Sequence, residues 1–214
     1  IMIYSDDQGW PGTSVQLDDR EPESKSDFYQ TPHLERLAAQ GMSFSNGYAA
    51  APKCAPSRFS LLTGMSVGKT HMSNIPERPG GKPEGRLITA KNERALGTAY
   101  LTIPEALKLI DESYRTAHFG KWHLRGGGPE SHGFDESDGA TSNGEGNKGP
   151  ESDPKLIFSL TQKGIDYMER CTKNGKPFYL QLSHYAVHRK IEALPKTIES
   201  YQARVKGERH HVAE

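Results

Sequence analysis

An α/β fold with a mainly parallel sheet and helices on both faces is predicted by three observations. Three apolar runs, at residues 1–4, 114–119 and 177–188, are typical of buried strands. Segments with helix start and stop signals lie between them. Polar residues follow each run, and ligands of open α/β sheets collect at such strand ends. With 214 residues, we expect one domain over 1–214.

The composition excludes several classes of protein. Lys plus Arg and Asp plus Glu are both 27, so no bulk charge favours a nucleic acid or an anionic membrane as partner. Hydrophobic residues make up 34%, the mean hydropathy is −0.74, and no apolar run approaches a membrane span. Two cysteines, Cys54 and Cys171, cannot form a disulfide framework. Both ends read as interior sequence, so we expect a piece of a longer protein in which any signal peptide precedes residue 1.

The first strand, 1–4, leads directly into two acidic residues. Asp6 and Asp7 stand between this strand and a turn at Gly9. Paired carboxylates at a strand end are suitable ligands for a hard cation. The alternative is an acidic turn exposed to solvent.

Residues 31–41 are predicted to form a helix, because the sequence contains both start and stop signals. Thr31 is expected as its N-cap, Pro32 as its first residue and Gly41 as its stop. Met42 and Phe44 alternate with polar residues, which predicts a strand that leads into the next helix.

The stretch 54–64 is the centre of the predicted site. Pro56 suits the first turn of a helix and Gly64 its left-handed end, with apolar residues between them for the core. Cys54 then lies at the helix N-terminus, where free N–H groups favour an anion. Arg58 lies one turn later on the same face. Together they describe an oxyanion site.

Two further groups of polar residues follow. Lys69, His71 and Asn74 come soon after this helix and either line the pocket or belong to a surface loop. A capping box at 102–105 predicts a helix that runs to about residue 111. The strand 114–119 follows, and His118 within it is expected to be packed. Lys121 and His123 come directly after this strand. These two side chains can face one anion if the backbone is extended there.

The remainder is a glycine-rich loop, a helix and a strand. The loop covers 125–153, where a long irregular segment is usually functional or disordered. The helix 153–173 carries the apolar residues Leu156, Leu160, Ile165 and Met168. The strand 177–188 ends in His188.

These motifs resemble those of a known family. Cys54-Ala55-Pro56-Ser57-Arg58 followed by Leu62-Thr63-Gly64 is similar to the signature of type I, formylglycine-dependent sulfatases of the alkaline phosphatase-like superfamily. The segments Asp6-Asp7-Gln8-Gly9 and Gly120-Lys121-Trp122-His123 resemble two further motifs of that family. The resemblance implies the N-terminal portion of a sulfatase catalytic domain. The alternative is a buried, inert cysteine that caps an ordinary helix.

The resemblance also implies a role for each residue. Cys54 would be oxidised to Cα-formylglycine and, with Asp6 and Asp7, would bind one divalent cation, Ca²⁺ first and Mg²⁺ as the alternative. Arg58 would hold these groups in place and Lys121 would neutralise sulfate. His123 would be the base for sulfate elimination and His188 a sulfate ligand that protonates the leaving group. Lys69, His71 and Asn74 resemble positions that vary among sulfatases of sulfated sugars. Further metal ligands and a second lysine are expected beyond residue 214.

The expected function is therefore hydrolysis of sulfate monoesters, on a sulfated saccharide or small molecule. The family resemblance also implies maturation by a formylglycine-generating enzyme and export to a periplasm, the exterior or a lysosome-like compartment, with no nucleic-acid partner and no membrane span. Two alternatives remain. One is a formylglycine-dependent phosphonate monoester or phosphodiester hydrolase, and the other is an inactive sulfatase-like binding protein with Cys54 unconverted.

Overall fold

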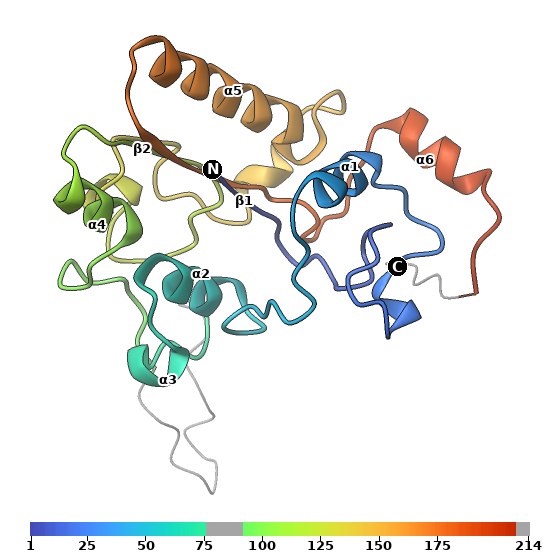
Figure 1. Cartoon of the computed structure of the whole chain (residues 1–214), viewed down its shortest axis with the longest axis horizontal. Helices are drawn as coiled ribbons and strands as arrows, with labels where there is room; N and C mark the ends of the chain where they lie inside the picture. The colour runs from blue at the N-terminus through green and yellow to red at the C-terminus, as the bar shows by residue number, and fades with distance from the viewer. Residues whose placement is uncertain (76–91, 209–214) are drawn as a thin grey trace, which may run out of the picture. The chain divides into compact units, whose positions relative to one another are not determined.

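The computed structural model describes residues 1–75 and 92–208 (Figure 1). The chain forms two compact units. The first contains Ile1–Asp7 and Ala49–Glu192, and the second contains Gln8–Tyr48 and the chain from Ala193 onward. Within the described ranges, no helix is long and apolar enough to cross a membrane.

A parallel sheet with strand order β1-β4-β2-β3 forms the centre of the first unit. Its strands are β1 (Met2–Tyr4), β2 (Arg115–Gly120), β3 (Glu136–Ser137) and β4 (Phe178–Ser183). Ile3 on β1 and Phe119 on β2 both pair with Leu182 of the central strand β4. The three strands predicted from apolar runs are therefore present, and the parallel arrangement is confirmed.

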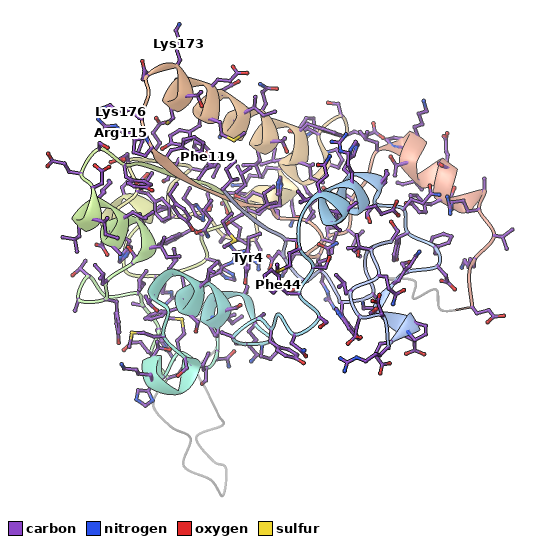
Figure 2. The ribbon with its side chains drawn as sticks, viewed as in Figure 1. Tyr4, Phe44, Arg115, Phe119, Lys173 and Lys176 are labelled. Atoms are coloured by element: carbon purple, nitrogen blue, oxygen red, sulfur yellow. The ribbon has the colours of Figure 1, made fainter. Side chains whose placement is uncertain are left out.

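One face of the sheet is covered by α5 (Ile157–Lys173), which follows the short 3₁₀ turn η4 (Pro154–Leu156). Alternate strand residues point toward this helix because successive side chains of a strand face opposite sides. Figure 2 shows Phe119 between β2 and α5. The buried cluster on this face consists of Ala117, Phe119, Leu160, Tyr167, Cys171, Leu180, Leu182 and Tyr185.

The opposite face is covered by α2 (Cys54–Thr63), which lies across the sheet from α5 (Figure 1). The hydroxyl groups of Tyr4 on β1 and Ser57 on α2 are 2.8 Å apart. A second buried cluster fills this side: Ala55, Phe59, Leu62, Met72, Leu96, Trp122, Leu124 and Phe134. Helices on both faces of the sheet are thus confirmed.

The buried stripe of α5 includes a glycine. Of the apolar residues on this helix, Ile165 is exposed, whereas its neighbour Gly164 is buried. A Cβ at position 164 would lie 2.9 Å from a methyl carbon of Leu182, so the absence of a side chain lets the helix approach β4 closely.

The remaining elements of the first unit are short. They are α3 (Val67–Thr70), α4 (Ile103–Ile110), η2 (Pro129–His132) and η3 (Glu145–Asn147). The capping box predicted for α4 is present, because the Thr102 N–H donates to the Glu105 carboxylate at 2.8 Å.

The second unit contains the elements η1 (Pro22–Ser24), α1 (Pro32–Gln40) and α6 (Pro195–Gln202). The α1 boundaries match the prediction, although Thr31 bonds to Ser14 in place of capping the helix. The strand predicted around Met42 and Phe44 is wrong. Both side chains are exposed, at 76% and 72%, and the segment is irregular because no strand of the described residues pairs with it.

His118 on β2 is packed as predicted, with 1% of its surface exposed. Its ring lies 5.2 Å from that of Trp122 and 5.5 Å from that of Phe134, and its Nε2 is 3.1 Å from the Ser183 hydroxyl. Burial, followed by the charge of Arg58, lowers the pKa of His118 to about 3. The histidine is therefore held neutral in the folded protein.

This shift predicts a pH dependence of stability. Between the pKa of His118 in the folded chain, about 3, and its ordinary value of 6.5, the unfolded state binds the extra proton. The free energy of unfolding should therefore fall as the pH is lowered through this window, with a slope of up to about 1.4 kcal/mol per pH unit from this group. Urea unfolding of the full-length protein at several pH values would measure it. His118→Gln should show a shallower decline, and an unchanged slope would contradict the prediction.

Candidate active site

The ends of three parallel strands bring the predicted polar residues to one edge of the sheet. Asp6 and Asp7 follow β1, Lys121 and His123 follow β2, and His188 follows β4. Backbone hydrogen bonds join these segments. The Asp6 N–H donates to the Ala186 carbonyl at 2.8 Å, the Val187 N–H donates to the Asp6 carbonyl at 2.7 Å, and the Lys121 N–H donates to the Ser183 carbonyl at 2.8 Å.

The turn at the end of β2 requires glycine. Gly120 has a φ of 96°, and a Cβ there would lie 2.1 Å from the Ser183 carbonyl oxygen. The following residues are held by Thr141, whose hydroxyl accepts from the Trp122 N–H at 2.9 Å and whose carbonyl accepts from the His123 N–H at 2.8 Å. Lys121 and His123 are therefore presented on a fixed backbone.

Helix α2 places Cys54 and Arg58 at the same edge. Cys54 is its first residue and half-buried, and Gly64 ends the helix with a φ of 66°, as the sequence predicted. The Cys54 Sγ lies 3.1 Å from Nδ1 of His123. In a converted protein, this sulfur would be replaced by the oxygen of the formylglycine.

A buried cluster of charges lies beside the cysteine. The Lys121 ammonium donates to Oδ2 of Asp6, and Nη2 of Arg58 is 3.8 Å from the same oxygen. Arg58 also donates through Nη1 to the Lys121 carbonyl. All three side chains are buried. Low-dielectric surroundings strengthen such pairs, so the cluster fixes its members with respect to one another.

Arg58 has unused hydrogen-bonding capacity. Its Nε and Nη2 are buried and have no hydrogen-bond partner among the residues described. Burial lowers the pKa of Arg58, while the charges of Asp6, Tyr4 and Cys54 act in the opposite direction, and a guanidinium group stays protonated in proteins. These N–H groups can therefore receive an oxygen ligand.

Tyr4 is a neighbour of Arg58 that the sequence analysis missed. The guanidinium carbon lies 5.1 Å from the centre of its ring, within the range of a cation–π contact. Figure 2 shows Tyr4 between the sheet and α2. The available signal was its place as the last residue of the first apolar run, directly before the acidic pair.

Asp7 and His188 form the more exposed part of the site. Nε2 of His188 lies 3.6 Å from Oδ2 of Asp7, and its Nδ1 is 2.8 Å from the Arg189 carbonyl oxygen. Asp7 and His123 both have positive φ values, 59° and 55°. Such conformations cost about 1–3 kcal/mol per residue and concentrate at functional sites.

The structure does not draw Lys69, His71 and Asn74 into this cluster of contacts. Lys69 and His71 are exposed. The Asn74 side chain accepts a hydrogen bond from Lys53, the N-cap of α2, at 2.8 Å. Asn74 therefore supports the start of α2, and a role of these residues in substrate binding stays a prediction.

This edge of the sheet provides a small number of oxygen ligands for a cation. Within residues 1–75 and 92–208, no group of three or more His, Cys, Asp and Glu side chains is arranged to hold a metal ion. Asp6 and Asp7 supply two carboxylates. Both ion pairs that Asp6 forms in the described part of the chain involve Oδ2, so Oδ1 remains available as a ligand.

The sequence of this chain is similar to those of known sulfatases. The Sulfatase family model matches residues 1–211. An N-acetylgalactosamine-6-O-sulfatase of Bacteroides thetaiotaomicron is 40% identical over 100 residues, which cover 47% of this chain and 17% of that protein. The mouse N-acetylgalactosamine-6-sulfatase is 28% identical over 226 residues, which cover 90% of this chain and 40% of that protein. The chain thus spans less than half the length of these relatives.

Solved structures show the same fold. Ps i-CgsB in complex with k-i-k-neocarrahexaose has a TM-score of 0.69 and 22% identity, covering 96% of this chain and 49% of that one. BT4656 in complex with its substrate D-glucosamine-2-N,6-O-disulfate has a TM-score of 0.64 and 23% identity, covering 94% of this chain and 37% of that one. Because the family model matches nearly the whole chain, the chain belongs to the sulfatase family, and its fold is that of the alkaline phosphatase-like superfamily.

Proposed function

We propose that the full-length protein hydrolyses sulfate monoesters of a sulfated carbohydrate, with a formylglycine derived from Cys54 as nucleophile and one divalent cation. The observation that carries the proposal is the convergence of Cys54, His123 and the Asp6–Arg58–Lys121 cluster at one sheet edge. The relatives named as N-acetylgalactosamine-6-sulfatases support a sulfated sugar as substrate class. Maturation by a formylglycine-generating enzyme and export belong to the same proposal.

The position of each residue in the site determines the role that we propose for it. Arg58 follows residue 54 by one turn of α2, and its Nε and Nη2 are buried without a hydrogen-bond partner in the described part of the chain, so they can hold oxygen atoms of the modified side chain. His123 lies within hydrogen-bond distance of residue 54, so it accepts a proton from that residue. Lys121 supplies positive charge for the sulfate oxygens. His188, half-buried beside Asp7, protonates the departing sugar oxygen.

A divalent cation fits the donor set at this edge. Asp6, Asp7 and the oxygen atoms of a converted Cys54 are hard ligands, which favour Ca²⁺ or Mg²⁺ over softer metals. When bound, such an ion supplies Lewis-acid stabilisation of negative oxygen. Asp6 can offer Oδ1 to the ion and keep Oδ2 for Lys121 and Arg58.

Parallel assays on the full-length protein test the proposed function. Preparations should first be checked by peptide mass for conversion of Cys54. Sulfated N-acetylgalactosamine and an aryl sulfate should be hydrolysed, and the matching phosphate, phosphodiester and phosphonate esters should react much more slowly. A preference for the phosphorus esters, or converted protein that hydrolyses neither class, would contradict the proposal.

Removal of the metal should lower activity. We expect exhaustive chelation to abolish most turnover, and readdition of Ca²⁺ or Mg²⁺ to restore it. Asp7→Asn keeps the shape of the side chain but removes one negative charge, so it should weaken metal binding, measured by calorimetry on the chelated protein. Undiminished activity after metal removal would show that Asp6 and Asp7 form only an acidic turn.

A further inference from the structure

A small cavity adjoins the candidate active site. It has a volume of about 290 Å³ and lies between residues 123–127 on one side and residues 140–142 on the other. His123 lines this cavity, and Nδ1 of the same residue lies 3.1 Å from the Cys54 Sγ. One residue therefore contacts both the cavity and the proposed nucleophile.

Both walls of the cavity come from the edge of the sheet that carries the other site residues. One wall follows the end of β2 and the other follows β3, and these two strands are parallel neighbours. The walls are joined, because the Thr141 carbonyl accepts from the His123 N–H at 2.8 Å. Ligands of open α/β sheets bind beyond the carboxyl ends of the strands. The cavity thus lies where a part of the substrate is expected.

The wall that follows β2 turns its carbonyl groups inward. The Arg125 carbonyl accepts from the Leu96 N–H at 2.7 Å, and Nε2 of His132 donates to the Gly126 carbonyl at 3.0 Å. Leu96 and His132 are both fully buried. In a trans peptide the C=O and N–H groups point in opposite directions. The N–H groups of Gly126 and Gly127 therefore point away from the interior.

These two N–H groups are free to bind a ligand. Gly126 and Gly127 are exposed, and neither N–H has a hydrogen-bond partner in the described part of the chain. Their φ values are 100° and 110°, and a Cβ at position 126 would lie 2.0 Å from the Leu96 carbonyl oxygen. Glycine is thus required here, and it leaves both donors uncovered by a side chain.

The opposite wall supplies an acceptor. The Glu145 carboxylate accepts from the Ser142 N–H at 2.6 Å and from the Ser142 hydroxyl at 3.1 Å. The Ser142 oxygen accepts one long hydrogen bond, 3.5 Å, from the Gly144 N–H, so one of its two lone pairs remains for a ligand hydroxyl. The bond from the Ser142 backbone is the main cause that lowers the pKa of Glu145, so the carboxylate stays ionised.

We propose that this cavity binds the sugar ring that carries the sulfate ester. Oxygen atoms of the sugar accept from the N–H groups of Gly126 and Gly127, and a sugar hydroxyl donates to Ser142. Walls with both donors and an acceptor suit a hydroxyl-rich ring, and the volume is near the lower end of ligand pockets, about 300–1,000 Å³, which fits one ring. This inference rests on the proposed function, since it locates the sugar of the same substrate.

The test compares the binding of two ligands to the full-length protein that carries Cys54→Ala, which prevents turnover. Calorimetry gives the Kd of a sulfated N-acetylgalactosamine and that of inorganic sulfate, which has no sugar. Ala140→Phe adds a ring to an exposed position of the cavity wall. The preference for the sugar over sulfate should therefore fall by about tenfold or more, as for one or two lost hydrogen bonds. The matched control is Thr172→Phe on the exposed side of α5, which should keep the preference.

Ser142→Phe is a second blocking variant, for the case in which Ala140→Phe does not fold, and it should have the same effect. A preference within about twofold of the parent protein in the folded variants would overturn the inference, as would a parent protein that does not bind the sugar. Hydrolysis is assayed separately, so either result would leave the proposed function standing. If the wild type hydrolyses no sulfate ester, the proposed function fails, while the two Kd values still decide whether the cavity holds the sugar.

Discussion

Cys54→Ala should abolish sulfate ester hydrolysis by the full-length enzyme, with kcat/KM reduced by on the order of 10⁴-fold or more, as for loss of a catalytic nucleophile. The side chain is small, half-buried and placed at the start of α2, and its sulfur contacts His123 at 3.1 Å. Its removal should therefore leave the fold largely intact. Steady-state kinetics together with thermal unfolding would separate lost chemistry from lost structure.

The chain offers a matched control for this experiment. Cys171 is the other cysteine and lies buried in the α5 side of the core. Cys171→Ala should lower stability but keep kcat/KM near the wild-type value. Cys54→Ser should lose turnover yet acquire one covalent sulfate, because a serine ester lacks the second hydroxyl that would expel it. Activity of Cys54→Ala within a few-fold of wild type would remove the proposed nucleophile.

Much of the candidate site could be predicted from the local sequence because its residues lie at the ends of strands and helices. The apolar runs before Asp6 and Lys121 defined strands, and parallel strands place their carboxyl ends at one edge. The helix from Cys54 to Gly64 carried both its start and its stop in the sequence. These helix and strand signals depend on a few neighbouring residues, so the elements can be predicted without knowledge of the tertiary structure.

Features that depend on distant partners were not predictable. The Asp7–His188 contact joins loops that are far apart in the chain, and no local pattern sets their distance. Lys155 resembles a solvated residue at a helix start, and only the packed structure shows that it is buried. The alternation at Met42 and Phe44 suggested a strand, but a strand also needs a neighbour with which to pair.

The ion pair between Lys121 and Asp6 was not predicted from the sequence. Lys121 was predicted to neutralise sulfate, and the structure in addition pairs its ammonium with the carboxylate of Asp6. The pairing stabilises both charges in a buried position. Lys121 therefore has two tasks in the proposed mechanism: it holds a metal-ligand candidate in place and supplies charge to the substrate.

Lys121→Ala should accordingly damage both substrate binding and turnover. One lost donor to a developing oxyanion costs about 2–4 kcal/mol in kcat/KM. Among the described residues, the substitution also leaves Arg58, 3.8 Å away, as the one cation paired with the buried Asp6. Metal affinity should change as well, and calorimetry on the chelated protein would detect it. Lys173→Ala, an exposed residue at the far end of α5 (Figure 2), serves as the control and should behave as wild type.

His123→Ala should give a different kinetic pattern from Lys121→Ala, and this contrast tests the assignment of both residues. His123 contacts residue 54, so its main task is to accept a proton from that residue after the ester bond has broken. The first turnover should then remain fast and later turnovers become slow, which rapid mixing would reveal as a burst of the alcohol product. Lys121→Ala should show no burst, because its loss slows the first step. If His123→Ala is slow in every turnover and shows no burst, His123 acts before or during attack on sulfur. If both variants are fully active, the segment after β2 has no catalytic role and is only a structural turn.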